Sequence, residues 1–224
     1  MPVYTLEEEI IFPHPSHADK DGLLAIGGDL TADRLLAAYS NGIFPWFNDD
    51  SPILWWSPDP RMVLLPGDFK RSKSLTQTIR RGSYKVRFDS NFRQVMNACA
   101  AAGNREEEGT WITDSMISAY CVLHDMGYAH SVETYLDDKL VGGLYGVSLG
   151  KAFFGESMFY IERDASKVAL SELIDRLLEW DFHIIDVQQR TKHLRSLGAK
   201  SIARNFFMIM LKQALNFPTI RGKW

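Results

Sequence analysis

The pattern that most constrains the fold is a strand, a helix and a second strand within residues 152–187. Residues 152–160 and 182–187 are runs of strand length with mostly apolar side chains, and residues 165–180 repeat apolar side chains at helical spacing. A strand–helix–strand crossover is right-handed and makes its two strands parallel. The sequence therefore predicts one parallel strand pair within a larger sheet.

The segments around this unit predict a mixed sheet. Residues 129–136 and 140–149 are strand-like, and Asp137 and Asp138 form the turn between them. Other strands are expected at residues 62–65 and 84–88, and helices at 72–81, 90–102, 113–126 and from Lys192 and Ser201. An antiparallel meander that leads into a parallel pair gives a mixed α/β fold. It resembles the GNAT acyltransferase architecture, in which two parallel strands splay apart and admit the acyl donor.

The first 62 residues differ in composition from the rest of the chain. They are rich in Pro, Gly and Trp and contain one clear helix at residues 32–40, with Thr31 as its N-cap and Gly42 just past its end. We expect residues 1–62 to form a small N-terminal subdomain. Residues 63–224 are expected to form the GNAT-like domain, with a mixed and largely antiparallel sheet.

Composition argues against several classes of protein. Cys99 and Cys121 are the only cysteines, so a zinc ribbon or a disulfide scaffold is not expected. His14 and His17 lie in a proline-bounded loop without a third ligand at helical spacing, so no metal site is predicted. No apolar run approaches ~18 residues, and the glutamate-rich start does not resemble a signal peptide. These features predict a cytoplasmic protein with no membrane partner.

The net charge of −3 conceals an uneven distribution of charge. Residues 70–93 and 187–224 together hold 16 of the 25 basic residues but 1 of the 28 acidic residues. Such basic stretches form either solvated helix faces or surfaces that bind nucleic acid, and the sequence leaves both readings open. Aromatic side chains near loops and helix starts, such as Trp46 and Trp111, could stack on bases or simply pack in the core.

Three polar residues interrupt apolar strands. Glu156 lies within the strand at residues 152–160, and Asp186 and Gln188 end the strand that follows the crossover helix. An alternating period places Phe154, Glu156 and Met158 on one face, although a bulge near Gly155 would change this. Buried polar groups in adjacent strands are candidates for a functional site, because burial costs free energy unless the groups are paired or used.

These residue types leave other interpretations open. The polar side chains could satisfy loop amides at a sheet edge. Two carboxylates could also serve glycoside hydrolysis, which requires a separation that the sequence does not give. A CoA-dependent acyltransferase is the nearest alternative, but residues 160–167 lack the glycine-rich loop that would bind pyrophosphate.

Several motifs together resemble the bacterial leucyl/phenylalanyl-tRNA–protein transferase family over about residues 3–215. The matching segments are 42–47 (GIFPWF), 53–61 (ILWWSPDPR), 109–113 (GTWIT), 140–146 (LVGGLYG), 154–159 (FGESMF), 186–188 (DVQ) and 196–199 (SLGA). The resemblance implies an aminoacyltransferase that moves Leu, Phe or Met from aminoacyl-tRNA to proteins with N-terminal Arg or Lys. Such proteins are thereby marked for degradation by the N-end rule pathway. The resemblance also implies that no cofactor is used.

The resemblance assigns roles by position. It implies that Asp186 and Gln188 are the catalytic pair and that Glu156 is the active-site carboxylate. Residues expected to hold the aminoacyl-adenosine are Trp46, Trp111, Tyr120, Leu144, Phe153, Met158, Leu170, Leu173 and Leu177. Three of these leucines (Leu144, Leu173 and Leu177) stand where the family has bulkier or softer side chains. The basic residues expected to meet the tRNA backbone are Lys73, Arg80 and Arg81.

We hypothesise that Gln188 orients the acceptor amine, that Asp186 stabilises the charged amine, and that Glu156 holds the acceptor or the terminal ribose. The acyl donor is an activated ester, so positioning alone supplies much of the catalysis. A monomer is expected. The remaining alternatives are a CoA-dependent GNAT enzyme and a tRNA-binding module without catalytic activity.

Overall fold

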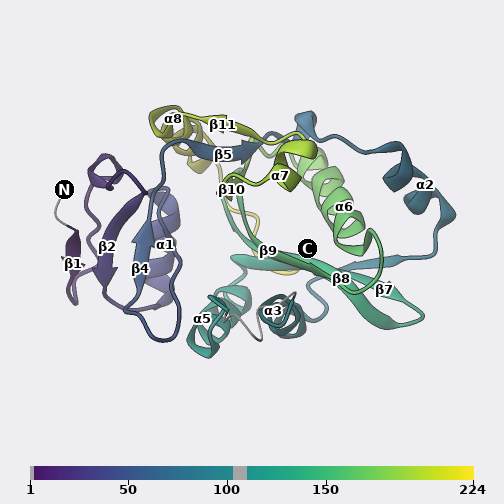
Figure 1. Cartoon of the computed structure of the whole chain (residues 1–224), viewed down its shortest axis with the longest axis horizontal. Coiled ribbons are helices and arrows are strands. Elements are labelled where there is room, and N and C mark those ends of the chain that lie inside the picture. The colour runs from purple at the N-terminus through teal and green to yellow at the C-terminus, as the bar shows by residue number, and fades with distance from the viewer. Residues whose placement is uncertain (1–2, 103–109) are drawn as a thin grey trace.

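The computed structural model describes residues 3–102 and 110–224, which contain two β-sheets (Figure 1). Gly109, the first residue of one family motif, lies outside these ranges. The smaller sheet has the strand order β1-β2-β4-β3. Its strands are β1 (Tyr4–Leu6), β2 (Leu23–Gly27), β3 (Phe44–Pro45) and β4 (Leu54–Trp56). The sequence did not predict this sheet, because its strands are too short for a recognisable alternation.

The larger sheet has seven strands in the order β11-β5-β10-β9-β8-β7-β6. In sequence order they are β5 (Arg61–Leu64), β6 (Lys85–Phe88), β7 (Ala129–Leu136), β8 (Lys139–Leu149), β9 (Ala152–Tyr160), β10 (Ile184–Gln188) and β11 (Lys200–Ile202). Strands β9 and β10 are parallel, and all the other neighbouring pairs are antiparallel. The predicted mixed α/β fold, with a mostly antiparallel sheet, is confirmed.

Strand β9 departs from the predicted alternation. Its pairing with β8 shifts register between Tyr145 and Gly146, so Glu156 is an extra residue between two paired positions. The bulge places Met158 in the same hydrophobic cluster as Phe153, and not beside Phe154. The prediction that Met158 and Phe154 share a face was therefore wrong, because one inserted residue reverses the facing of all later ones.

Helices cover both faces of the large sheet (Figure 1). Helix α6 (Ala165–Glu179) lies on one face, beside α2 (Lys73–Arg81), whereas α3 (Phe92–Ala100) and α5 (Asp114–Asp125) lie on the other. The sequence predicted all four. Within the described residues, the other helices are α1 (Ala32–Ser40), α7 (Lys192–Ser196), α8 (Arg204–Leu215) and two single 3₁₀ turns, η1 (Pro15–His17) and η2 (Pro66–Asp68).

The predicted start of the last helix was wrong. Ser201 belongs to β11, which pairs with β5 at the edge of the large sheet, and α8 begins at Arg204. The backbone groups of residues 200–202 therefore bond to a neighbouring strand, a long-range contact that helical periodicity does not reveal.

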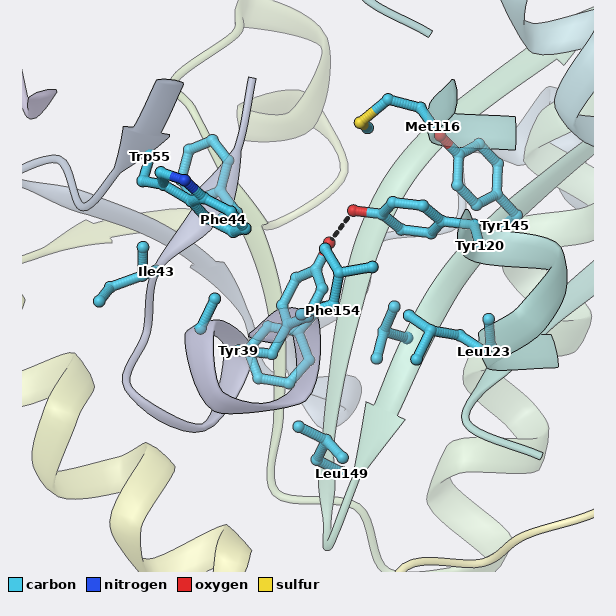
Figure 2. Close-up of a cluster of buried hydrophobic side chains, with 14 of the residues drawn as sticks. Tyr39, Ile43, Phe44, Trp55, Met116, Tyr120, Leu123, Tyr145, Leu149 and Phe154 are labelled. Atoms are coloured by element: carbon cyan, nitrogen blue, oxygen red, sulfur yellow. Dashed lines mark hydrogen bonds between the residues drawn. The ribbon is translucent and has the colours of Figure 1, made fainter. Parts of the chain in front are cut away.

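One hydrophobic cluster joins the N-terminal segments to the large sheet. Figure 2 shows Tyr39 from α1, Phe44 from β3 and Trp55 from β4 gathered with Tyr120 from α5 and Phe154 from β9. A second cluster fills the space between α6 and the face of the large sheet that α6 covers. The boundary after residue 62 stays a prediction, and the core runs continuously across it.

The described residues provide neither a membrane-spanning helix nor a cluster of metal ligands. Within residues 3–102 and 110–224, no helix combines the length and the hydrophobicity needed to cross a bilayer. The same residues bring no three His, Cys, Asp or Glu side chains together as a metal-binding group.

Candidate functional site

A buried ion pair links β5 to β10. Arg61 donates from Nε to Oδ1 of Asp186 at 2.9 Å and from Nη2 to Oδ2 at 2.6 Å, and both side chains are fully enclosed. The Arg61 guanidinium lies 4.8 Å from the ring centre of Phe44 and 4.7 Å from that of Phe207. Such a bidentate pair between aromatic rings fixes the orientation of the carboxylate.

Asp186 in turn holds the backbone of Gln188. The Gln188 N–H donates to Asp186 Oδ1 at 3.0 Å, and Gln188 has the left-handed backbone angle φ = 56°. The pairing of β10 with β5 also shifts register between these two residues. A residue other than glycine rarely adopts this backbone angle unless its surroundings stabilise it, and here the hydrogen bond to the Asp186 carboxylate does so.

The irregular end of β10 turns Gln188 toward Glu156. Gln188 Nε2 donates to Glu156 Oε1 at 2.7 Å, and Tyr39 Oη donates to the same oxygen at 2.8 Å. Tyr120 Oη donates to Oε2 at 3.5 Å, and the two tyrosine hydroxyls are hydrogen-bonded to each other (Figure 2). Glu156 therefore sits at the centre of a hydrogen-bond network drawn from α1, α5 and β10.

Burial raises the pKa of Glu156 to about 7, and the nearby Asp186 charge also raises it. The hydrogen bonds from Tyr39 and Gln188 and the charge of Arg61 act in the opposite direction. Burial also raises the pKa of both Tyr39 and Tyr120 well above the usual value, so both hydroxyls stay protonated near neutral pH. Glu156 can therefore take up or release a proton near pH 7, and the tyrosines act as donors.

Glu156 and Gln188 face a cavity of about 240 Å³. Trp46 and Trp111 line the same cavity, and Trp46 keeps 37% of its surface exposed. The other lining residues are Phe44, Pro45, Ser157, Val187, Gln189, Thr191 and Leu194. Asp186 does not line the cavity, because it is enclosed by Arg61 behind Gln188.

The six apolar residues predicted to hold the donor side chain lie together in the cluster under α6. Five are buried, namely Leu144, Phe153, Leu170, Leu173 and Leu177, and Met158 is partly buried. Val187 and Leu194 pack against this cluster and also line the cavity. The cluster and the cavity are therefore contiguous.

The three predicted tRNA-binding residues lie apart from this cavity. Lys73, Arg80 and Arg81 are exposed on α2, which Ser72 caps by accepting a hydrogen bond from Leu75 N. Helix α2 packs beside α6, on the side of the molecule away from the small sheet (Figure 1). The structure thus brings Glu156, Gln188 and the two tryptophans together at the cavity. It buries Tyr120 and Asp186 completely, so neither lines the cavity, and it places the basic residues elsewhere.

Sequence reasoning missed Tyr39 and Arg61. Tyr39 lies 117 residues before Glu156, and Arg61 lies 125 residues before Asp186. Arg61 ends the motif at residues 53–61 and Tyr39 lies in a predicted helix, yet neither position indicates its partner. A basic residue entering an apolar strand was the one available signal at Arg61.

Comparison with known proteins gives matches over nearly the whole chain. The family described as leucyl/phenylalanyl-tRNA protein transferase matches residues 63–212, and its N-terminal domain matches residues 28–59. Proteins named leucyl/phenylalanyl-tRNA–protein transferase from Thermodesulfovibrio yellowstonii and Desulfatibacillum aliphaticivorans are each 54% identical over 100% of this chain, which covers 91% and 96% of those relatives. Among solved structures, an aminoglycoside acetyltransferase from an uncultured soil sample has a TM-score of 0.40 and 17% identity, over 52% of this chain and 84% of its own.

Proposed function

We propose that the cavity is the active site, because the chain belongs to the leucyl/phenylalanyl-tRNA protein transferase family. It is therefore an aminoacyltransferase that takes Leu or Phe from aminoacyl-tRNA and joins it to the α-amino group of proteins that begin with Arg or Lys. The observation that carries the proposed mechanism is the hydrogen bond between Gln188 and Glu156 on the cavity wall.

The reaction needs a neutral amine next to an activated ester. A protein α-amine has an unperturbed pKa of about 7.7–8.0, so most of it is protonated at pH 7. We infer that the Glu156 carboxylate takes a proton from this amine, because Glu156 faces the cavity and titrates at about pH 7. The amine nitrogen then bonds to the ester carbonyl carbon, and the bond from that carbon to the ribose oxygen breaks. Glu156 passes its proton to the departing ribose oxygen. The freed carboxylate then takes the second proton, which the attacking nitrogen must lose to become the amide, and releases this one net proton to solvent.

Gln188 acts as the positioning partner of this base. Its Nε2 is committed to Glu156, which leaves its side-chain oxygen to accept a hydrogen bond from the amine. An amide is too weak a base to remove the proton itself. Fixing the amine beside the carboxylate supplies the large rate advantage of intramolecular reactions.

Asp186 takes a different role from the one hypothesised from the sequence. Both of its carboxylate oxygens are occupied by Arg61, and one also accepts from Gln188 N. We propose that it holds Gln188 in place without touching the substrate. Glu156 takes over the contact with the amine.

The aromatic walls fit the terminal adenosine of the tRNA. Bases of single-stranded RNA ends stack on aromatic rings, and Trp46 and Trp111 both face the cavity. Tyr120 is fully buried and is proposed to act on the ribose only through Glu156, to which its hydroxyl donates at 3.5 Å. The donor side chain then points past Val187 and Leu194 toward the apolar cluster under α6.

The basic residues of α2 are proposed to contact the tRNA backbone outside the cavity. Charge attraction to phosphates needs no fixed geometry, which suits exposed side chains on one helix. We further propose that the enzyme accepts Leu, Phe and Met as donors and proteins with N-terminal Arg or Lys as acceptors. It acts as a cytoplasmic monomer and marks its products for the N-end rule pathway.

A single-turnover assay tests the mechanism. Labelled leucine is followed from Leu-tRNA to an Arg-terminal peptide with the unmodified chain, Glu156→Gln and Gln188→Ala. We expect each variant to lose at least about 10²-fold in rate at saturating substrate. The matched control is Glu179→Gln, which changes an exposed carboxylate on α6 and should leave the rate unchanged. Full activity of Glu156→Gln would exclude this carboxylate as the base.

The same assay separates the alternatives. Binding of tRNA without transfer by the unmodified chain would indicate a tRNA-binding module, and acetyl-CoA turnover would indicate a CoA-dependent enzyme.

A further inference from the structure

The last described residue, Trp224, is held in an aromatic slot on the α6 side of the large sheet. Its ring stacks on His130 with centroids 3.9 Å apart and planes 13° apart. The centroids of Trp180, Phe153 and Phe182 lie 5.1, 5.8 and 5.9 Å away. Trp224 also packs against the cluster that holds the six donor-pocket candidates.

The segment that carries Trp224 is anchored along its length. The Gly150 N–H donates to Thr219 Oγ1 at 2.8 Å, and Arg221 donates two hydrogen bonds to the carbonyl of Met126, at 3.0 and 2.7 Å. The Trp224 N–H donates to the buried Asp89 carboxylate at 3.0 Å. The indole therefore occupies a defined position, partly buried against the core.

Phe153 is the wall shared by this slot and the proposed donor pocket. Its ring also lies against Gly146, where an added Cβ would come within 2.6 Å of ring carbons of Phe153. Trp224 and Gly146 therefore both limit where the Phe153 ring can lie. A packed interior leaves little room for either ring to shift alone.

We propose that Trp224 is a specificity-determining residue, which sets the depth of the donor side-chain pocket by bracing Phe153. This inference rests on the proposed function. The indole lies beside Phe153 within the cluster that holds the donor-pocket candidates, so its volume limits how far the Phe153 ring can withdraw. Removing the indole lets Phe153 retreat, which deepens the pocket and favours the larger Phe donor over Leu.

The test compares kcat/KM for Phe-tRNA and Leu-tRNA with an Arg-terminal peptide as acceptor. Pocket changes of one methylene shift such ratios by about 10- to 200-fold. We expect Trp224→Ala to raise the Phe:Leu ratio by about tenfold and Trp224→Phe to raise it less. Lys223→Ala, in the neighbouring exposed residue, is the control and should leave the ratio unchanged.

The ratio distinguishes specificity from stability, since a merely destabilised enzyme loses both activities by the same factor. Equal losses for the two donors in Trp224→Ala would overturn the inference. The variant Phe153→Ala distinguishes a failure of the inference about Trp224 from a failure of the proposed function. A shifted ratio in Phe153→Ala with none in Trp224→Ala refutes the role of Trp224 alone. An unshifted ratio in both, from an active unmodified enzyme, refutes the proposed pocket as well. Should Trp224→Ala fail to fold, an unchanged ratio in folded Trp224→Phe refutes the inference.

Discussion

Tyr39→Phe is the most direct perturbation of the proposed base, because it removes one hydroxyl and leaves the ring in the core. That hydroxyl donates to Glu156 Oε1 at 2.8 Å and helps to lower the pKa of Glu156 against the effect of burial. A hydrogen bond to a charged group is worth about 1.5–3 kcal/mol, equivalent to about 1–2 pH units. The pKa of Glu156 should therefore rise from about 7 to roughly 8–9.

The sign of the activity change follows from the ionisation of the base. The carboxylate is the active form, so the transfer rate rises with pH through the pKa of Glu156. In Tyr39→Phe this rise moves to higher pH, and the rate at pH 7 falls by about fivefold to fiftyfold. At sufficiently high pH the two rates converge. Tyr120, 3.5 Å from Oε2, is placed to offset part of the change.

Single-turnover transfer measured from pH 5.5 to 9.5 checks this prediction. The acceptor amine titrates in the same range, but its pKa belongs to the substrate and is common to all variants. Tyr160→Phe, which removes an exposed hydroxyl from the same sheet, is the matched control. An unchanged acid limb in Tyr39→Phe, or an equal shift in Tyr160→Phe, would refute the role of the Tyr39 hydrogen bond.

Three further changes test the charges of the molecule. Glu156→Gln should stabilise the fold by up to about 3 kcal/mol at pH 8 and little at pH 4, measured by urea unfolding. The pKa of Glu156 is higher in the folded than in the unfolded state, so ionisation of this carboxyl destabilises the unmodified protein as pH rises from about 4.5 to 7, and the glutamine variant avoids that loss. Arg61→Met should destabilise by about 3–5 kcal/mol by leaving Asp186 buried and unpaired, and adding Asp186→Asn should recover part of the loss in the same measurement. Neutralising the basic residues of α2 should reduce the slope of log Kd for tRNA against log salt by about 2–3, and an unchanged slope would exclude this helix from the interface. The residues to neutralise are Lys73, Arg80 and Arg81.

Local patterns in the sequence predicted the large sheet well. Apolar runs of strand length and the Asp137–Asp138 turn located β7, β8, β9 and β10, and the crossover helix made the last two strands parallel. Both aspartates of the turn adopt positive φ, as the tight hairpin requires. The small sheet escaped prediction because its strands gain stability from pairing across distant segments, and not from a periodic pattern of their own.

The candidate site shows where sequence reasoning stops. Glu156, Asp186 and Gln188 stand out as polar residues in apolar strands, but their roles depend on contacts with Tyr39 and Arg61 more than 100 residues away. The bulge at Glu156 also has no signal beyond the adjacent Gly155. One extra residue decides that Glu156 meets the tyrosines and that Met158 joins the cluster under α6.

The two carboxylates of the site differ in charge environment because different partners contact them. Asp186 receives a guanidinium that Phe44 and Phe207 enclose, and it is left with no route to the cavity. Glu156 receives only neutral donors, so burial can lift its pKa to about 7. An anchor paired with a guanidinium and the proposed base can therefore lie on adjacent strands in separate roles. Because Phe44 comes from β3 and Tyr39 from α1, the small N-terminal part belongs to the proposed catalytic apparatus, and its removal should abolish transfer even where the large sheet still folds.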